Sequence, residues 1–123
     1  MRVLIVDDAA DVRHVLTRLI QRRFPQSVTY EAADGFEAGQ KVMSLHPDLV
    51  ILDIHIPGLD GLRVCRSLRS YSMLKNTVVL AVTGDKDPEL KSAILQAGAN
   101  AVLMKPVYPR EFETVLDDLL PRG

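Results

Sequence analysis

Acidic, hydroxyl and amine side chains stand at the ends of four short apolar runs in this 123-residue chain. Asp7 and Asp8 follow the first run, Asp53 follows the third, and Thr83 and Lys105 follow the last two. Three carboxylates brought close together repel one another, so at least one pKa would rise unless a cation lay among them. An all-oxygen ligand set suits Mg²⁺ or Mn²⁺ and not zinc. The pattern therefore predicts a site for a divalent metal.

Thr83 and Lys105 complement the acidic residues with a hydroxyl donor and a point charge, which together suit a phosphate group. One carboxylate could serve as a nucleophile and give an acyl phosphate, while the metal and Lys105 neutralise charge on the phosphoryl group in flight. Each residue alone has a simpler interpretation, since an Asp after a strand is usually a helix N-cap and Thr83-Gly84 is a common turn. Matched chemistry after four separate runs favours the phosphate site.

The elements that must position these side chains are strands and helices in regular alternation. Five apolar runs predict strands, and four of them are nearly continuous, as in strands buried on both faces. The predicted strands are Val3–Val6, Val28–Tyr30, Leu49–Leu52, Val78–Val82 and Ala101–Met104. Apolar residues at three- and four-residue steps predict five helices. The predicted helices are Ala10–Phe24, Gly35–Leu45, Gly61–Tyr71, Pro88–Ala97 and Pro109–Leu120, the last closed by Pro121.

Five alternations of strand and helix predict an α/β fold, an open doubly wound parallel sheet with right-handed crossovers. A closed eight-fold barrel needs about twice as many residues. Ligands of open parallel sheets bind beyond the carboxyl ends of the strands, which is the edge that carries the polar residues described above. The second run ends in Ala32-Ala33-Asp34, so we expect its strand to stand away from the site.

Composition and charge narrow the class of protein. Hydrophobic residues make up 47% and charged residues 25% of the chain, which is typical of one globular domain, and we assign that domain to residues 1–123. A net charge of −1 and a pI of about 6.3 give no basic excess for nucleic acid. Cys65 is the single cysteine, so no internal disulfide can form, and we expect a cytoplasmic location. No apolar run approaches the roughly 20 residues of a membrane span.

Six short motifs, taken with their order and spacing, resemble the receiver domain of two-component response regulators, in particular the single-domain chemotaxis regulators. The resemblance covers essentially the whole chain. It implies a flavodoxin-like (βα)5 three-layer sandwich whose parallel sheet has the strand order 2-1-3-4-5. The matching motifs are Val3-Leu4-Ile5-Val6-Asp7-Asp8, Pro47-Asp48-Leu49-Val50-Ile51-Leu52-Asp53, Pro57-Gly58-Leu59-Asp60-Gly61, Val82-Thr83-Gly84, Ala97-Gly98-Ala99 and Lys105-Pro106.

The same resemblance implies a phosphorelay function. A histidine kinase or a histidine phosphotransfer protein would transfer a phosphoryl group to Asp53, and Thr83 and Lys105 would bind that group. The peptide bond between Lys105 and Pro106 would be cis. The implied ligands of Mg²⁺ (or Mn²⁺) are Asp7, Asp8, Asp53 and the backbone carbonyl of His55.

The resemblance also implies a switch rather than a true enzyme, with at most self-phosphorylation from small donors and weak autodephosphorylation. Phosphorylation would alter the face formed by the fourth helix, fifth strand and fifth helix. That face would bind a downstream protein target or output domain, or a second copy of the chain as a homodimer. No direct contact with nucleic acid or membrane is expected.

The sequence departs from the family pattern at two places, and the first concerns how phosphorylation would change the rest of the domain. Val102 stands where the family often has a Tyr or Phe, three residues before the lysine, that turns inward when Thr83 moves toward the phosphoryl group. Tyr108 lies three residues after the lysine and could substitute only from a different position. A shift of the loop after Thr83 is then the expected route for the signal. Ile56-Pro57 replaces the usual Met-Pro, an apolar exchange with little expected effect.

The sequence also allows other functions, and several further residues have expected positions. The missing aromatic leaves open a receiver-like module that binds partners without phosphorylation. An aspartate-nucleophile phosphatase would have two acids separated by one residue, whereas Asp7 and Asp8 are adjacent. His55 and Asp85 are expected at the mouth of the site, where they would control water access to the acyl phosphate. His14 and His46 are expected on the surface, and Cys65 in the core.

Overall fold

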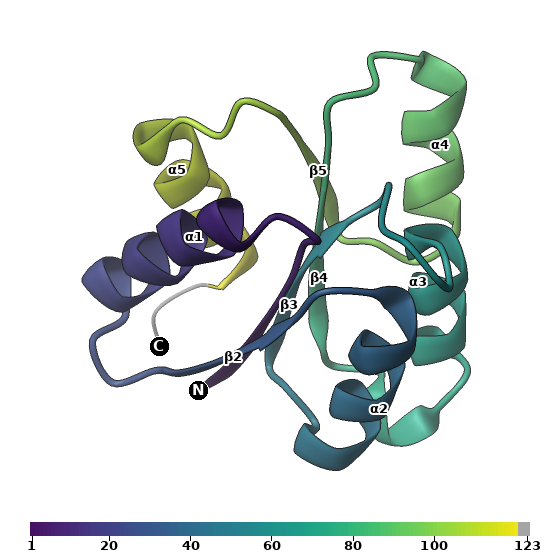
Figure 1. The fold of residues 1–123 in the computed structure, drawn as a ribbon, viewed down its shortest axis with the longest axis horizontal. Helices are drawn as coiled ribbons and strands as arrows, with labels where there is room; N and C mark the ends of the chain where they lie inside the picture. Colours follow the sequence, from purple (N-terminus) through teal and green to yellow (C-terminus); the bar gives the residue numbers. More distant parts are fainter. Residues whose placement is uncertain (121–123) are drawn as a thin grey trace.

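The computed structural model describes residues 1–120 as a five-stranded parallel sheet with helices on both faces (Figure 1). The strand order is β2-β1-β3-β4-β5, which confirms the predicted flavodoxin-like topology. The elements are β1 (Arg2–Val6), α1 (Ala10–Arg23), β2 (Val28–Ala32), α2 (Gly35–Leu45), β3 (Leu49–Asp53), α3 (Gly61–Arg69), the 3₁₀ helix η1 (Ser72–Leu74), β4 (Val78–Thr83), α4 (Pro88–Gln96), β5 (Ala101–Met104) and α5 (Pro109–Leu119).

The helices form two layers, with α1 and α5 on one face of the sheet and α2, α3 and α4 on the other (Figure 1). Side chains of β1 alternate between two cores. Val3 and Ile5 face the core under α1 and α5, while Leu4 and Val6 face the core under the other three helices. Because both faces are covered, the central strands are apolar at nearly every position, and this explains their continuous runs in the sequence.

The order of strands brings β1 and β3 together at the middle of the sheet, where the chain changes its direction of winding. Parallel pairing aligns Val6 with Leu52 and Asp53 with Val82, so the carboxyl ends of β1, β3 and β4 lie at one edge. In open α/β sheets this switch point is where ligands bind. The strand β2 lies at the far side of β1, away from β3, as predicted.

The third helix is shorter than predicted. It ends at Arg69, and Tyr71 is extended and exposed, so the prediction of a helix to Tyr71 was wrong. The cause is a set of contacts from distant parts of the chain. The Arg69 guanidinium donates to the carbonyls of Gly98 at 2.9 Å and Thr77 at 2.7 Å, and to the Asn100 side chain at 2.8 Å. These bonds fix the C-terminal end of α3 beside β4 and β5.

The structure also gives the positions of several residues whose burial or exposure the sequence predicted. Cys65 is buried, as predicted, and burial raises the pKa of its thiol. His14 and His46 are exposed. Pro121, expected to close the last helix, lies outside the described residues. Within residues 1–120, no helix is long and apolar enough to cross a membrane.

Candidate functional site

Three carboxylates converge at the carboxyl edge of β1 and β3. Asp7 and Asp53 are almost completely buried, with 1% and 5% of their surface exposed, whereas Asp8 is exposed. Each offers an oxygen atom within 4.8 Å of the other two. The structure thus brings together the three acidic residues that the sequence placed at the ends of two different strands.

Backbone contacts hold the first acidic residue in place. The Asp7 N–H donates to the carbonyl of Ala32 on β2 at 3.1 Å, and the Asp7 carboxylate accepts from the N–H of Ala9 at 2.9 Å. The guanidinium of Arg13, one turn into α1, donates to the Asp7 carbonyl at 2.7 Å and to Glu31 at 3.0 Å. No local signal in the sequence indicates these contacts of Arg13.

Lys105 provides the positive charge of the site. Its Nζ donates to Asp7 Oδ2 at 3.1 Å and to Asp53 Oδ2 at 3.0 Å, while its backbone N–H donates to the Thr83 carbonyl at 2.9 Å. The bond from Lys105 to Pro106 is cis, as expected. The lysine therefore joins the ends of β1, β3 and β4 through one side chain and one amide.

The electrostatics of the cluster favour an additional cation. Burial raises the pKa of Asp53, and the neighbouring charge of Asp7 adds to this effect, while Lys105 opposes it. Burial alone would lower the pKa of Lys105, but its hydrogen bonds and charge interactions with Asp53 and Asp7 raise it. Three carboxylates face one ammonium group, and all candidate ligands are oxygen atoms. This donor set fits a hard divalent cation such as Mg²⁺.

Thr83 begins a chain of hydrogen bonds that runs along the β4–α4 loop (residues 84–87). The Thr83 side chain is buried, and its Oγ1 accepts from the N–H of Asp85 at 3.1 Å. Asp85 in turn accepts from the N–H of Asp87 at 3.0 Å. Asp87 is the N-cap of α4 and accepts from the N–H of Glu89 at 2.9 Å. We call this series of three hydrogen bonds, from Thr83 through Asp85 and Asp87 to Glu89, the relay. Sequence reasoning missed it, although acidic residues at alternate positions after a Thr are typical of such turns.

His55 and Asp85 face each other across the mouth of the site. Their Nε2 and Oδ2 atoms are 3.7 Å apart, and the two side chains are 60% and 45% exposed. The backbone N–H of His55 donates to Asp53 Oδ1 at 3.1 Å. The structure thus places this pair beside the acidic cluster, where the sequence predicted it.

The position of the expected aromatic switch contains no aromatic ring. Val102 is half-buried and packs against the core under α2, α3 and α4. Tyr108 is 59% exposed at the N-cap of α5. Val102 therefore has no ring to turn toward Thr83, and the ring of Tyr108 lies largely in solvent.

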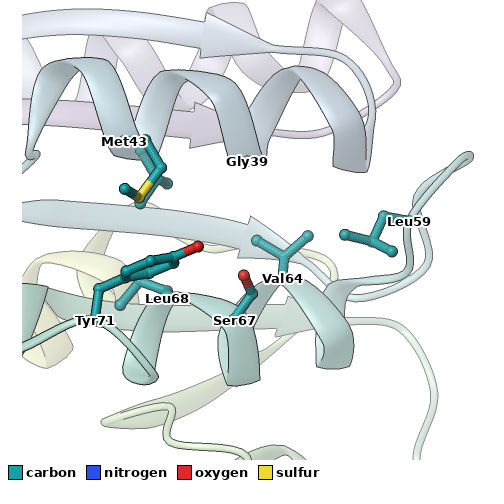
Figure 2. A pocket seen from close by; sticks show the side chains of 8 residues that line it. Gly39, Met43, Leu59, Val64, Ser67, Leu68 and Tyr71 are labelled. Carbon is teal, nitrogen blue, oxygen red and sulfur yellow. The ribbon is translucent and has the colours of Figure 1, made fainter.

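A groove on the molecule lies apart from this cluster. It runs between α2 and α3, and no acidic residue of the site lines it (Figure 2). Its walls are mostly apolar, with the hydroxyl-bearing Ser67 and Tyr71 on the α3 side. The chemistry described above is confined to the carboxyl edge of the sheet.

Comparison with known proteins identifies the family of this chain. The family model for the response regulator receiver domain matches residues 3–117. The chain belongs to the receiver domain family. This receiver domain therefore belongs to two-component signalling, as its motifs predicted.

Curated relatives match most of this chain in sequence and extend beyond it. A protein-glutamate methylesterase/protein-glutamine glutaminase of Myxococcus xanthus is 42% identical over 106 residues, which are 86% of this chain and 30% of the relative. The chain spans about a third to a half of the length of the curated relatives it matches.

Solved structures give the same fold. The receiver domain of a DNA-binding response regulator from Colwellia psychrerythraea superposes with a TM-score of 0.91 at 28% identity, covering 99% of both chains. The receiver domain of a Pseudomonas aeruginosa sensor histidine kinase, with magnesium coordinated in its active-site cleft, gives 0.86 over 98% of both chains. At 23% identity, the latter shares the fold alone.

Proposed function

We propose that this receiver domain is a phosphorylatable switch whose phosphoacceptor is Asp53. The observation that carries the proposal is the geometry around that carboxylate. It is buried on the central strand, Lys105 Nζ lies 3.0 Å from its Oδ2, and oxygens of Asp7 and Asp8 lie within 4.8 Å of one of its oxygens. A buried nucleophile with a fixed cation and a metal-binding set suits phosphoryl transfer.

In the proposed reaction, a carboxylate oxygen of Asp53 attacks the phosphorus of a phosphohistidine on a histidine kinase or phosphotransfer protein. The new P–O bond forms as the P–N bond breaks, and the imidazole leaves with the bonding electron pair. Lys105, already beside Asp53, contacts a phosphoryl oxygen, and the Thr83 hydroxyl donates to another. Mg²⁺, held by Asp7, Asp8, Asp53 and the His55 carbonyl, would supply neutralisation of the phosphoryl charge.

The relay from Thr83 offers a route for the signal that needs no aromatic side chain. Movement of Thr83 Oγ1 toward the phosphoryl group would weaken the bond it accepts from the N–H of Asp85. In the next two bonds, Asp85 accepts from the N–H of Asp87, and Asp87 accepts from the N–H of Glu89 in the first turn of α4. The proposed outcome is a change in the face formed by α4, β5 and α5.

That face is the proposed binding site for a downstream protein or output domain, or for a second copy of the chain. We expect no direct binding to nucleic acid or membrane. The chain would act as a phosphoacceptor with at most self-phosphorylation from small donors and weak autodephosphorylation. Its cytoplasmic location stays a prediction.

Intact mass spectrometry after incubation with Mg²⁺ and acetyl phosphate tests the chemistry. We expect a single phosphoryl adduct, absent from Asp53→Asn and from a sample treated with chelator. Asp118→Asn, which changes an exposed acid on α5, is the matched control and should retain the adduct. An adduct that persists in Asp53→Asn would place the phosphoacceptor elsewhere.

A second candidate is a receiver-like module that binds its partner without phosphorylation, and the valine at position 102 favours it. Beryllofluoride binding provides a second measurement, because it does not depend on phosphoryl transfer from a small donor. Failure of both acetyl phosphate and beryllofluoride to modify or bind the protein would support this second function.

A further inference from the structure

The start of α2 makes an unusually close contact with the β3–α3 loop (residues 54–60). The backbone N–H of Gly35 donates to the Pro57 carbonyl at 3.0 Å. A Cβ atom at Gly35 would lie 1.7 Å from the carbonyl oxygen of Leu59 and 2.5 Å from its carbonyl carbon. No side chain can occupy that space, so the main chain of the loop rests directly on Gly35.

Phe36 makes a second contact with the same loop. Its ring is 67% exposed, yet it lies so close to Gly58 that a Cβ there would be 2.9 Å from a ring atom. Gly58 also has a φ of +79°, which disfavours other residues. Phe36 thus covers the turn of the loop, although most of its ring remains in contact with solvent.

The rest of the loop is fixed to the sheet. Ile54 and Ile56 are buried, and the Ile54 N–H donates to the Val82 carbonyl at 3.2 Å. The Gly61 N–H, at the start of α3, donates back to the Ile54 carbonyl at 3.1 Å. Between these anchors lies His55, whose N–H donates to Asp53. A displacement of the loop would therefore move the backbone beside the phosphoacceptor.

We propose that Gly35 is a positioning residue for the metal site, because it seats the loop that places the His55 backbone next to Asp53. Phe36 contacts the same loop at Gly58 and helps to hold it. We call this contact surface, formed by Gly35 and Phe36, the seat of the loop. The inference rests on the proposed function, in which the His55 carbonyl is a metal ligand. It assigns to the first turn of α2, which contributes no ligand, control over the affinity of the acidic cluster for Mg²⁺.

Helix α2 itself supplies a matched control. Gly39 has nothing within 4 Å of where a Cβ would stand, because it faces the open groove between α2 and α3 (Figure 2). Gly35→Ala and Gly39→Ala therefore make the same chemical change in one helix, with a clash in only the first. Gly39 lies in the interior of α2, where replacing Gly by Ala raises helix propensity by up to about 1 kcal/mol, so the control variant should fold.

The experiment is a Mg²⁺ titration followed by amide NMR chemical shifts, with circular dichroism to confirm folding. We expect Gly35→Ala to weaken Mg²⁺ binding roughly tenfold, the lower end of typical outer-shell effects, and Gly39→Ala to leave it unchanged. The rate of phosphoryl uptake from acetyl phosphate should fall in Gly35→Ala at low Mg²⁺ and recover at saturating Mg²⁺. Because Mg²⁺ would also stabilise a partly unfolded variant, circular dichroism at low Mg²⁺ must show that Gly35→Ala is folded before the recovery is assigned to metal binding.

Phe36→Ala keeps the test decisive if Gly35→Ala does not fold. It adds no atoms and removes a mostly exposed ring, and we expect Mg²⁺ affinity to fall severalfold, less than the roughly 10–100-fold loss that is typical when a direct outer-shell partner is removed. Met73→Ala on η1, 62% exposed and outside the seat, is its control. Unchanged Mg²⁺ affinity in the folded Gly35 and Phe36 variants overturns the inference. A wild-type chain that binds no Mg²⁺ instead overturns the metal site of the proposed function.

Discussion

Two loops flank Asp53, and they are held by different kinds of contact. The β3–α3 loop buries Ile54 and Ile56 and rests its main chain on Gly35. The β4–α4 loop is exposed at every position from 84 to 87, and a series of side-chain oxygens, starting from Thr83, accepts its backbone N–H groups. One loop is built around buried apolar groups, and the other around solvent-accessible hydrogen bonds.

The energies of these contacts differ accordingly. Burying an Ile side chain contributes about 1.5–3 kcal/mol to the free energy of folding. The close contact with Gly35 also leaves the main chain of the loop little room to move toward α2. A single intramolecular hydrogen bond contributes about 0.5–1.5 kcal/mol, because water can replace it. Segments with few buried apolar contacts open at low free energy. The β3–α3 loop is therefore suited to hold the proposed metal site in place, and the β4–α4 loop is suited to change on the proposed phosphorylation.

Removing the first link of the relay should have the largest effect. Thr83→Ala deletes the oxygen that accepts from the N–H of Asp85, at a cost of about 1 kcal/mol in the free energy of unfolding. We expect beryllofluoride still to bind, since Asp53 and Lys105 are intact. The amide chemical-shift changes that it causes in residues 84–91 should be largely lost.

Thr83→Ser is the matched control, because it keeps the hydroxyl and should restore most of those shift changes. Shift changes in residues 54–60 should be similar in both variants and in the wild type. If the Ala variant transmits the change to α4 as well as the wild type does, the relay is not the route of the signal and the contrast between the loops is wrong.

The two loops end in similar helix caps, which allows a direct comparison of the next largest effect. Asp87 caps α4 and Asp60 caps α3, each through a carboxylate that accepts a backbone N–H. Replacing either by Ala should lower the free energy of unfolding by about 1 kcal/mol, measured by urea denaturation. Only Asp87→Ala should also reduce the response of α4 to beryllofluoride, because Asp60 has no place in the relay.

Hydrogen exchange separates the two outcomes further. Amides of Glu89, Leu90 and Lys91 should exchange faster in Asp87→Ala, whereas those of α4 should be unaffected by Asp60→Ala. An equal loss of the α4 response in both variants would mean that it follows global stability rather than the last link of the relay.

Much of this architecture could be predicted because the information is local or periodic. Continuous apolar runs marked the central strands, and parallel strands necessarily bring Asp7, Asp53 and Thr83 to one edge. The second strand was predicted to end at Tyr30, yet it continues to Ala32. Glu31 obscured the pattern because this edge strand is partly exposed, and its carboxylate pairs with Arg13.

What sequence reasoning missed depends on contacts between distant segments. Gly35 was read only as the first residue of a helix, and its role as a seat for Leu59 is visible only once α2 and the β3–α3 loop are packed together. Arg69 ends α3 through acceptors on Thr77, Gly98 and Asn100. Local patterns contain no information about such partners, because the fold alone decides which carbonyl groups come within reach.

The smallest expected effect concerns a contact between the two loops. His55 Nε2 on the β3–α3 loop and Asp85 Oδ2 on the β4–α4 loop are 3.7 Å apart, and both side chains are largely exposed. Replacing His55 by Ala should change the free energy of unfolding by less than about 0.5 kcal/mol, as is usual for surface pairs. The acyl phosphate should nevertheless hydrolyse about twofold faster, equivalent to about 0.4 kcal/mol in the barrier, because water reaches the mouth of the site more easily.

The decay of the phosphoryl adduct after removal of acetyl phosphate, followed by intact mass, measures this effect. His14→Ala changes an exposed histidine on α1 and should leave the lifetime unchanged. Asp85→Asn removes the charge but keeps an oxygen that can accept from the N–H of Asp87, so it should shorten the lifetime without interrupting the relay. An unchanged lifetime in His55→Ala would show that the two loops act independently at the mouth, and that the side chains there do not control access of water to Asp53.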